Sequence, residues 1–419
     1  MNIPAERRQR AASAFRDGVV LLHASSRLDW SGDGFRQDPY FYYFTGLENT
    51  VGVVLAIDGK SGESWLFLPA NPAHSRFGLQ PEIRPGSEDA KRLGIEHVVD
   101  WVELESFLSS RATQRPVLYY AANWETFGEL PSQLLSARSP DAPLWLQVIL
   151  QKWSALEAKD VTHQIEALME VQSEGEASAL RNAAKTTVAA FMAGIKAIRP
   201  NVSQRSVEAV VSSSCWSQGA HGPSFWPWVM AGENAVFPRP LFSDARYDHL
   251  DRTMPAGELV RLDVGCEWEH YLGDLGRTVP VSGHYDDAQR EVWTIFVDAY
   301  RAGAKALRVG VTEDRVFEVW QKELVSHRAS AKSALAQHAI DSWSDRKNVP
   351  FWEIHATNLI FDYVSTHLRA GMTINFEPIA SVDGQGFFLE DMYLITKDGA
   401  ELLTPGVPYS AEEIERAMR

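Results

Sequence analysis

Two stretches of the sequence decide the fold: LVRLDVGCEWEHYLGDLGRTVPV at residues 259–281 and GMTINFEPIASVDGQGFFLEDMYLIT at residues 371–396. In the second stretch, two strand-like runs flank Asp383-Gly384, and an Asp-Gly pair between apolar runs is a strong hairpin signal. In the first stretch, apolar and polar side chains alternate over residues 259–264, which predicts a strand with two different faces. We therefore expect two antiparallel hairpins.

Each expected hairpin brings two carboxylates together. Glu377 and Glu390 are equally far from the Asp-Gly turn, so they should face each other roughly 5 Å apart at Cβ. A turn just after Trp268 would likewise place Asp263 opposite Asp274. Facing like charges destabilise a sheet unless something neutralises them, so the pairs suggest one or two bound cations. The alternative is that each acid is a solvated side chain or an ion-pair partner.

Composition limits the class of protein. The chain has 419 residues with 40 Lys plus Arg and 55 Asp plus Glu, and its formal net charge is -15. Such an acidic balance argues against a nucleic-acid partner, and no run approaches the ~18 apolar residues of a membrane helix. Two cysteines, Cys215 and Cys266, cannot form a disulfide framework, and we expect two buried, reduced side chains. With no signal-peptide pattern at the start, we expect a cytoplasmic location.

Apolar periodicity predicts an α/β (α+β) protein of two domains. Residues 1–157 form the first domain and residues 158–419 the second. The expected elements are strands at 51–57, 65–68 and 117–120, one long helix over 160–198, a helix carrying the stripe 292–299, and a helix after Thr312.

The acidic motifs resemble those of the pita-bread metallopeptidases, the family of aminopeptidase P, prolidase and methionine aminopeptidase. LDVG supplies Asp263, GDLGRT supplies Asp274 eleven residues later, NFEPI supplies Glu377 and FLEDMYLIT supplies Glu390. The stretch FRQDPYFYYFTGLENTVGVVLAID at 35–58 is similar to the aminopeptidase P N-terminal domain. The resemblance implies a creatinase/prolidase-like α/β domain followed by a pita-bread catalytic domain.

The same resemblance implies two divalent metal ions per chain, with manganese first and cobalt, zinc or iron as alternatives. Asp263 would chelate one ion, Asp274 and Glu390 would bridge both, and Glu377 with a histidine would complete the second. Two ions ~3.5–4 Å apart share a hydroxide and polarise the scissile carbonyl. Glu377 would also act as the general base.

The histidine ligand has more than one candidate, because WEIHATNLIFDYVSTHLRAGM (352–372) lacks the glycine pattern of the family. We prefer His355, which places Asp362 where the family has a second, substrate-side histidine. His367 is the second choice. If HATN instead matches an upstream family motif, the ligand position falls on Leu359.

Positions that hold the substrate in the family differ here. Arg239 stands at the position of a family histidine and Phe388 at that of a family arginine, so we expect substrate contacts from Arg239, Asp362 and His367. We interpret Arg277 and Asp391 as supporting residues.

The leading hypothesis is an Xaa-Pro aminopeptidase or dipeptidase that acts on small peptides as a homodimer or homotetramer. The alternatives are hydrolysis of a non-peptide amide or another C–N bond in a small metabolite, and a non-catalytic relative. The changed substrate positions favour hydrolysis of another amide or C–N bond. Loss of the histidine ligand would favour a non-catalytic relative.

Overall fold

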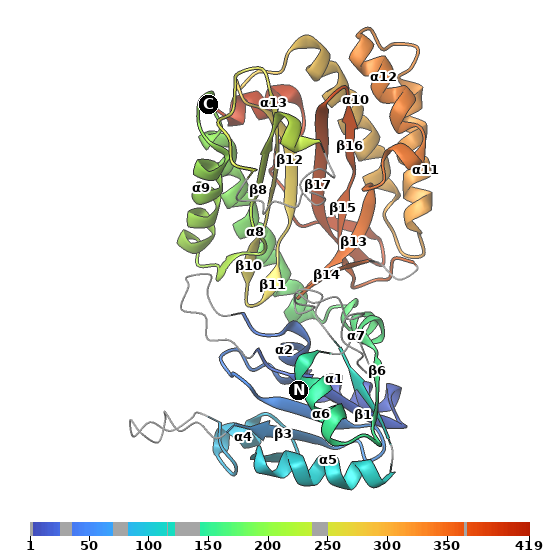
Figure 1. Ribbon diagram of the computed structural model, residues 1–419. Helices are drawn as coiled ribbons and strands as arrows, with labels where there is room; N and C mark the ends of the chain where they lie inside the picture. The colour runs from blue at the N-terminus through green and yellow to red at the C-terminus, as the bar shows by residue number, and fades with distance from the viewer. Residues whose placement is uncertain are drawn as a thin grey trace. The chain divides into compact units, whose positions relative to one another are not determined.

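The computed structural model describes residues 3–25, 36–69, 83–114, 116–121, 143–236, 250–363 and 367–419. The chain divides into two compact units, Met1–Met169 and Glu170–Arg419 (Figure 1). The sequence predicts the division slightly earlier, after residue 157.

The first unit is built on a mixed sheet of six strands, counted over the described residues, in the order β4-β3-β2-β1-β5-β6. Central β1 pairs antiparallel with β2 and parallel with β5. The three strands predicted from the sequence correspond to β2, β3 and β5. The strands are β1 (Gly18–His23), β2 (Val54–Asp58), β3 (Ser64–Leu68), β4 (His97–Asp100), β5 (Val117–Tyr120) and β6 (Glu157–Asp160), and the helices are α1 (Ile3–Ala14), α2 (Pro39–Thr45), α4 (Glu88–Arg92), α5 (Val102–Gln114), α6 (Leu144–Lys152) and α7 (Thr162–Met169).

The single long helix expected over 160–198 is wrong, because α7 ends at Met169 and α8 (Glu174–Ala197) begins anew. A capping box at Ser173 starts the second helix. The backbone N–H of Ser173 donates to Glu176 Oε2 over 2.7 Å, and the N–H of Glu176 donates to Ser173 Oγ over 3.4 Å. These bonds satisfy backbone amides that the first turn of a helix leaves unpaired. A separate helix, α8, therefore begins after Ser173.

The second unit contains a nine-stranded sheet and a three-stranded sheet, again over the described residues. The large sheet follows the order β14-β13-β15-β17-β12-β9-β8, and β16 and β18 also pair with the long strand β17. The small sheet has the order β11-β10-β7. The strands are β7 (Gly222–Pro223), β8 (Trp228–Ala231), β9 (Leu259–Val264), β10 (Cys266–Trp268), β11 (Tyr271–Leu272), β12 (Leu275–Pro280), β13 (Glu353–Thr357), β14 (Phe361–Tyr363), β15 (Thr373–Glu377), β16 (Ile379–Val382), β17 (Gln385–Thr396) and β18 (Gly399–Leu402).

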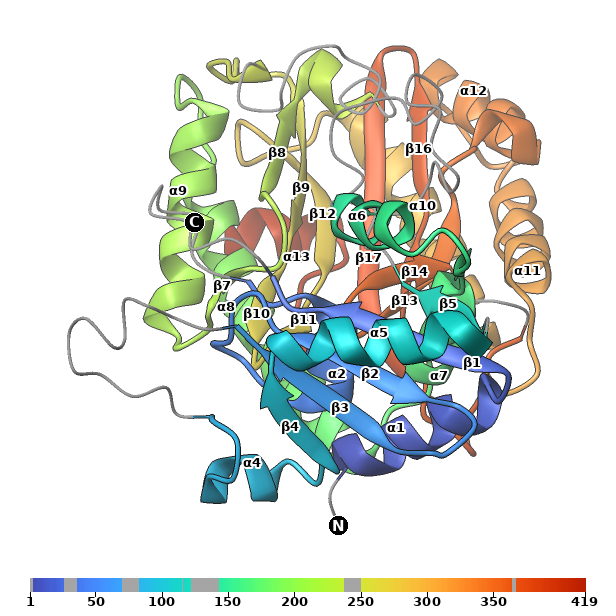
Figure 2. The ribbon, with the colours of Figure 1, turned by 60° about the horizontal axis from the view of Figure 1, so that its bottom comes forward.

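Helices cover this sheet with apolar faces. In Figures 1 and 2, α8 and α9 lie beside β8 and β9, whereas α12 lies beside β16. The predicted stripe of Val292, Ile295, Phe296 and Ala299 is buried in α10, and Thr312 caps α11. None of the described helices is both long and apolar enough to span a membrane. Besides α8, the helices of this unit are α9 (Gln204–Ser217), α10 (Asp287–Ala306), α11 (Glu313–Ser326), α12 (Ala334–Trp343) and α13 (Ala411–Ala417).

The predicted Asp-Gly hairpin is confirmed. Val382 pairs with Gln385 across the turn, and both turn residues have positive φ, 47° at Asp383 and 75° at Gly384. The same register joins β15 to β17. This register therefore places the end of β15 opposite the middle of β17.

The register predicted for the first hairpin is wrong by two residues. Asp263 pairs with Gly276 of β12 rather than with Asp274. The reason is the turn, which lies at Glu269 and His270, with positive φ values of 51° and 67°. Two successive positive φ angles give the hairpin turn that matches strand twist, and non-glycine residues occupy it here, so composition does not reveal its place.

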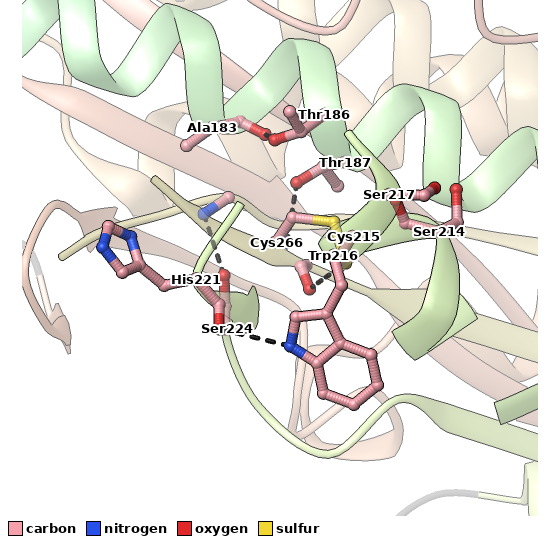
Figure 3. Close-up of a disulfide and its surroundings, with 12 residues drawn as sticks. Ala183, Thr186, Thr187, Ser214, Cys215, Trp216, Ser217, His221, Ser224 and Cys266 are labelled. Atoms are coloured by element: carbon pink, nitrogen blue, oxygen red, sulfur yellow. Dashed lines mark hydrogen bonds between the residues drawn. A yellow bond between two sulfur atoms is a disulfide. The ribbon is translucent and has the colours of Figure 1, made fainter. Parts of the chain in front are cut away.

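The two cysteines also differ from expectation, because they form a disulfide rather than two separate thiols. Cys215 lies in the last turn of α9 and Cys266 begins β10 (Figure 3). Their Cα atoms lie 5.5 Å apart. Thr187 of α8 accepts a 2.9 Å hydrogen bond from the Cys266 amide. The bridge therefore ties α9 to the strand that follows Asp263. No spacing rule predicts such a pair, since the two residues meet only through the packing of α9 on the sheet.

Candidate metal centre

Sheet register brings the acidic side chains of the two hairpins onto one face. Gly276 in β12 pairs with Asp263 on one side and with Glu390 on the other. Directly opposed residues in a sheet point to the same face, so both carboxylates flank the glycine. Glycine is required here because a Cβ at this position would lie 1.8 Å from the ring of Phe388.

His355 of β13 lies at the centre of the acidic group. Its Nε2 atom is 3.3 Å from Glu377 Oε2, 3.3 Å from Glu390 Oε1 and 3.8 Å from Asp274 Oδ2. The side chain of Glu377 is 12% exposed and that of Glu390 is 1% exposed. The structure therefore brings the five predicted ligands together, and their side chains are largely buried. They are Asp263, Asp274, His355, Glu377 and Glu390.

Two sets of possible ligand atoms share one residue. Asp274, His355 and Glu390 form one set and Asp263, Glu377 and Glu390 form the other, with the atoms of each set within 4.8 Å of one another. The family resemblance grouped Glu377 with the histidine, whereas these sets group it with Asp263. In both descriptions Glu390 belongs to both sites.

The donor atoms fit a divalent cation. Asp274 Oδ1 and Glu390 Oε2 are buried and have no hydrogen-bond partner among the described residues. Buried carboxylate oxygens without a partner lose hydration free energy, which a cation between them would restore. Carboxylate oxygens with one imidazole match the ligand preference of Mn and related ions.

Electrostatics support the same interpretation. Burial and the charge of Glu377 raise the pKa of Asp263 to about 7, and burial and the charge of Glu390 raise the pKa of Glu377 to about 7. Burial also raises the pKa of Glu390 to about 6 and that of Asp274 well above its usual value. Burial lowers the pKa of His355, but hydrogen bonds to Glu377 and Glu390 outweigh burial and raise it well above the usual value. In the absence of a cation, these raised pKa values favour proton binding by the four carboxyl groups and His355, which reduces the repulsion between the carboxylates.

Asn375 is a site residue that the sequence analysis missed. It faces His355 across β13 and β15, and its Nδ2 donates to Glu390 Oε1 over 2.7 Å. Thr357 in turn donates to Asn375 Oδ1 over 2.8 Å. The bond to Asn375 fixes one oxygen of the shared carboxylate. Alternation along NFE could have found Asn375, because it lies two residues before Glu377 on the same face.

A buried ion pair supports Glu390 from the other face of β17. Arg277 Nη1 donates to the backbone oxygen of Glu390 over 2.6 Å, and Nη2 donates to both oxygens of Asp391 over 2.9 and 3.1 Å. Thr404 and Tyr409 donate to the same carboxylate over 2.8 and 2.7 Å. The supporting role expected for Arg277 and Asp391 agrees with these contacts.

The other residues predicted from the sequence are not part of the two ligand sets, or lie outside the residues that the structure describes. His367 is exposed and belongs to neither set of ligand atoms. Asp362 lies in β14 and pairs with Ala356, but its side chain is outside the described part. Arg239 falls within residues 237–249, which are also outside it. Leu359, the alternative ligand position, carries no donor atom and is buried.

Sequence comparison identifies the family. Residues 178–397 match the model of metallopeptidase family M24, and residues 5–119 match the aminopeptidase P N-terminal domain. The chain belongs to metallopeptidase family M24. It is accordingly a metal-dependent hydrolase with the α/β N-terminal and pita-bread catalytic domains that the motifs predict.

Relatives of this M24 protein match nearly its whole length. It is 26% identical to the Xaa-Pro aminopeptidase of Escherichia coli, over 98% of this chain and 96% of the relative. It is 27% identical to the Xaa-Pro dipeptidase of Pyrococcus horikoshii, over 88% of this chain and 91% of the relative.

Solved structures share the fold. A putative aminopeptidase P from Bacillus anthracis matches with a TM-score of 0.79 at 21% identity, covering 100% of this chain and 98% of that one. Zinc-substituted E. coli aminopeptidase P with product matches with a TM-score of 0.77 at 23% identity, covering 100% and 98%.

Proposed function

We propose that this M24 protein hydrolyses the amide bond before proline in short Xaa-Pro peptides with the help of two divalent cations. The observation that carries the proposal is the pair of ligand sets that share Glu390. One shared carboxylate between two sets is the arrangement that two neighbouring ions need. The relatives named Xaa-Pro aminopeptidase and Xaa-Pro dipeptidase supply the substrate class.

Asp274, His355 and Glu390 would hold one ion, and Asp263, Glu377 and Glu390 the other. When bound, divalent ions supply Lewis acidity, which activates water and polarises a scissile carbonyl. Manganese is the first choice, because four carboxylates and one imidazole suit it, and cobalt, zinc or iron are alternatives.

Glu377 is the residue that we assign to proton transfer. Its side chain is 12% exposed, the largest value among Asp274, His355, Glu377 and Glu390. A carboxylate next to the metal ions can accept a proton from water and pass it to a leaving amine. The nitrogen of proline leaves as a secondary amine and needs that proton.

Activity assays with defined metal content test the proposal. Protein purified without chelators should contain about two transition-metal ions per chain and should cleave Ala-Pro or Ala-Pro-Xaa peptides when supplied with Mn. Protein that takes up no Mn, Co or Zn would overturn the metal-dependent mechanism. Protein that binds metal but cleaves no proline peptide would overturn only the assignment of Xaa-Pro peptides as the substrate.

A second candidate is hydrolysis of a non-peptide amide on the same metal centre. Phe388 favours it, because an apolar ring lies over Gly276 beside the carboxylates, where the family has a guanidinium. A panel of small amides separates the two candidates. We also retain the predictions of a homodimer or homotetramer, testable by light scattering, and of a cytoplasmic location.

A further inference from the structure

Two candidate ligands are joined by a segment that two helices hold in place. Asp263 and Asp274 belong to different ligand sets, and β10, β11 and the turn between these strands connect the two residues. Cys266 begins this connection, three residues after Asp263. Its sulfur is bonded to Cys215 of α9, and its backbone N–H donates to Oγ1 of Thr187 in α8 over 2.9 Å (Figure 3). One residue therefore attaches the connection to both helices.

The two ends of the connection meet at Cys266. The N–H of Gly273 donates to the backbone oxygen of Cys266 over 3.0 Å. A Cβ on Gly265 would lie 1.9 Å from the backbone oxygen of Gly273, and a Cβ on Gly273 would lie 2.1 Å from Oγ1 of Thr187. The backbone can approach this closely only because both positions are glycine. We call Gly265, Cys266 and Gly273 the neck of the hairpin.

The neck limits where Asp274 can lie. The ladder between β9 and β12 ends at the pair of Val264 and Leu275, and Asp263 lies inside this ladder. Asp274 lies beyond the last pair, between the ladder and the neck residue Gly273. On the side of the sheet, an amide side chain of β15 donates to the backbone oxygen of Asp274 over 3.2 Å. The position of Asp274 relative to Asp263 therefore depends on the neck as well as on the sheet.

The disulfide lies where a change of volume is not easily absorbed. Cys215 and Cys266 are both 0% exposed, and they belong to the core that also contains Val264 and Leu275. Reduction of the bond would leave two thiols, with two more hydrogen atoms, in this space. Because protein interiors are close-packed, extra volume moves neighbouring backbone and side chains. Cys266 is itself part of the neck, so reduction should displace the neck and, with it, Asp274.

We propose that the Cys215–Cys266 disulfide positions Asp274 relative to Asp263, so that the protein binds its second divalent ion more tightly in the disulfide form than in the dithiol form. The inference rests on the two-ion centre of the proposed function. Both cysteines are positioning residues, because neither belongs to a ligand set. Binding linkage is reciprocal, so the metal ions should stabilise the disulfide against reduction by the same factor.

A reduction titration of the wild-type, full-length protein tests this linkage. A dithiol such as dithiothreitol breaks the S–S bond and gives two electrons and two protons to the cysteine sulfurs, while it closes to a cyclic disulfide. The ratio of dithiol to cyclic disulfide at half reduction is measured with and without saturating Mn, after the thiol content has become constant. We expect Mn to raise this ratio at least tenfold, since contacts that orient metal ligands are worth about ten- to a hundredfold in metal affinity.

An unchanged ratio would overturn the proposal. Circular dichroism of the same samples follows the fold, which should persist after reduction. A reduced protein that unfolds would also overturn the proposal, because the disulfide would then stabilise the fold without setting metal affinity.

Two variants separate the covalent bond from packing and from stability. Cys215→Ala/Cys266→Val keeps apolar side chains in the core without the bond, and calorimetric titration with Mn should show at least tenfold weaker binding of the second ion. Leu324→Ala is the control, because it removes a buried side chain from α11, which packs on α10 and α12. The control should melt at a lower temperature than the wild-type protein and keep the wild-type Mn affinity.

Two results would contradict the proposal. Wild-type Mn affinity in the double variant would show that the bond does not position the ligands, and an equal loss of affinity in Leu324→Ala would assign the effect to stability alone. Failure of the proposed function gives a different result. A protein that binds two Mn ions in a redox-dependent way but cleaves no Xaa-Pro peptide contradicts only that substrate. A protein that binds no Mn in either form overturns the metal centre and this inference together.

Discussion

Nε2 of His355 lies 3.3 Å from Oε1 of Glu390, although the two residues are on strands β13 and β17, which are separated by β15. The contact is possible because both side chains point to one face of the same sheet. It favours His355 over His367 as the candidate histidine of the centre, since His367 is exposed and lies in neither ligand set.

Replacement of His355 therefore tests the ligand assignment. His355→Ala should bind at least one metal ion fewer per chain than the wild-type protein, because one of the two ligand sets loses its only nitrogen donor. Metal content by mass spectrometry measures this. His367→Ala is the matched control and should keep the full content, and the opposite result would assign the site to His367.

Glu377 should matter more for turnover than for binding. Glu377→Gln keeps the size and one oxygen ligand but cannot accept a proton, so kcat on Ala-Pro should fall by about 10²–10⁴. Steady-state kinetics at saturating Mn measure the loss. Glu353→Gln is a useful comparison, because Glu353 pairs with Glu377 across β13 and β15 and lacks a place in either ligand set. A larger loss in Glu353→Gln than in Glu377→Gln would be incompatible with the assigned base.

The metal-free protein should become less stable as pH rises. Burial raises the pKa of Asp263 and Glu377 to about 7, above the values of about 4 for unfolded Asp and Glu. Groups with raised pKa values bind more protons in the folded state, so their contribution is present in full below pH ~4 and is lost as pH rises through ~7. The melting temperature in EDTA should thus fall from pH 5.5 to pH 8.

Saturating Mn should reverse this trend, because ionised carboxylates bind the cation and protonated ones do not. Differential scanning calorimetry across this pH range compares the two conditions. A metal-free protein whose melting temperature rises steadily over the same interval would show that the carboxyl group pKa values are not raised.

Because of the disulfide, the thermal stability of the protein should depend on the presence of a reductant. Cys215 and Cys266 are 51 residues apart, and closing a loop of that size stabilises a protein by about 2–4 kcal/mol. The melting temperature should fall on addition of a phosphine reductant and in Cys215→Ser, whereas the double serine variant should not respond to reductant. Mass spectrometry of protein trapped at lysis gives the thiol state, and two free thiols there would fit the cytoplasmic location that we predict from sequence.

The Arg277–Asp391 pair should be among the most sensitive positions in the fold. Both side chains are 0% exposed, so Asp391→Ala leaves a buried guanidinium without its carboxylate and should cost about 3–5 kcal/mol in the free energy of unfolding. Chemical denaturation measures this. Glu318→Ala removes the partner of Arg315 in an exposed pair and should change stability by less than ~1 kcal/mol.

Local sequence patterns predicted several elements well. The strands at 65–68 and 117–120, the helix cap at Thr312 and the Asp-Gly hairpin appear in the structure as expected. Each depends on residues close in sequence, whose turn and periodicity preferences act locally. The break between α7 and α8 was also local, but the capping box at Ser173 was not recognised as a helix start.

By itself, the sequence determined the hairpin that brings Glu377 toward Glu390, because an Asp-Gly turn fixes the register of its strands. It also determined the family, since the acidic motifs are short and keep their order. Only the tertiary structure decided the neighbours of those acids: the pairing of Asp263 with Gly276, the disulfide, and the contacts of Arg261 with the rings of Trp228 and Phe388. These contacts join residues from separate strands and helices, so they depend on how the sheet assembles, which no local preference specifies.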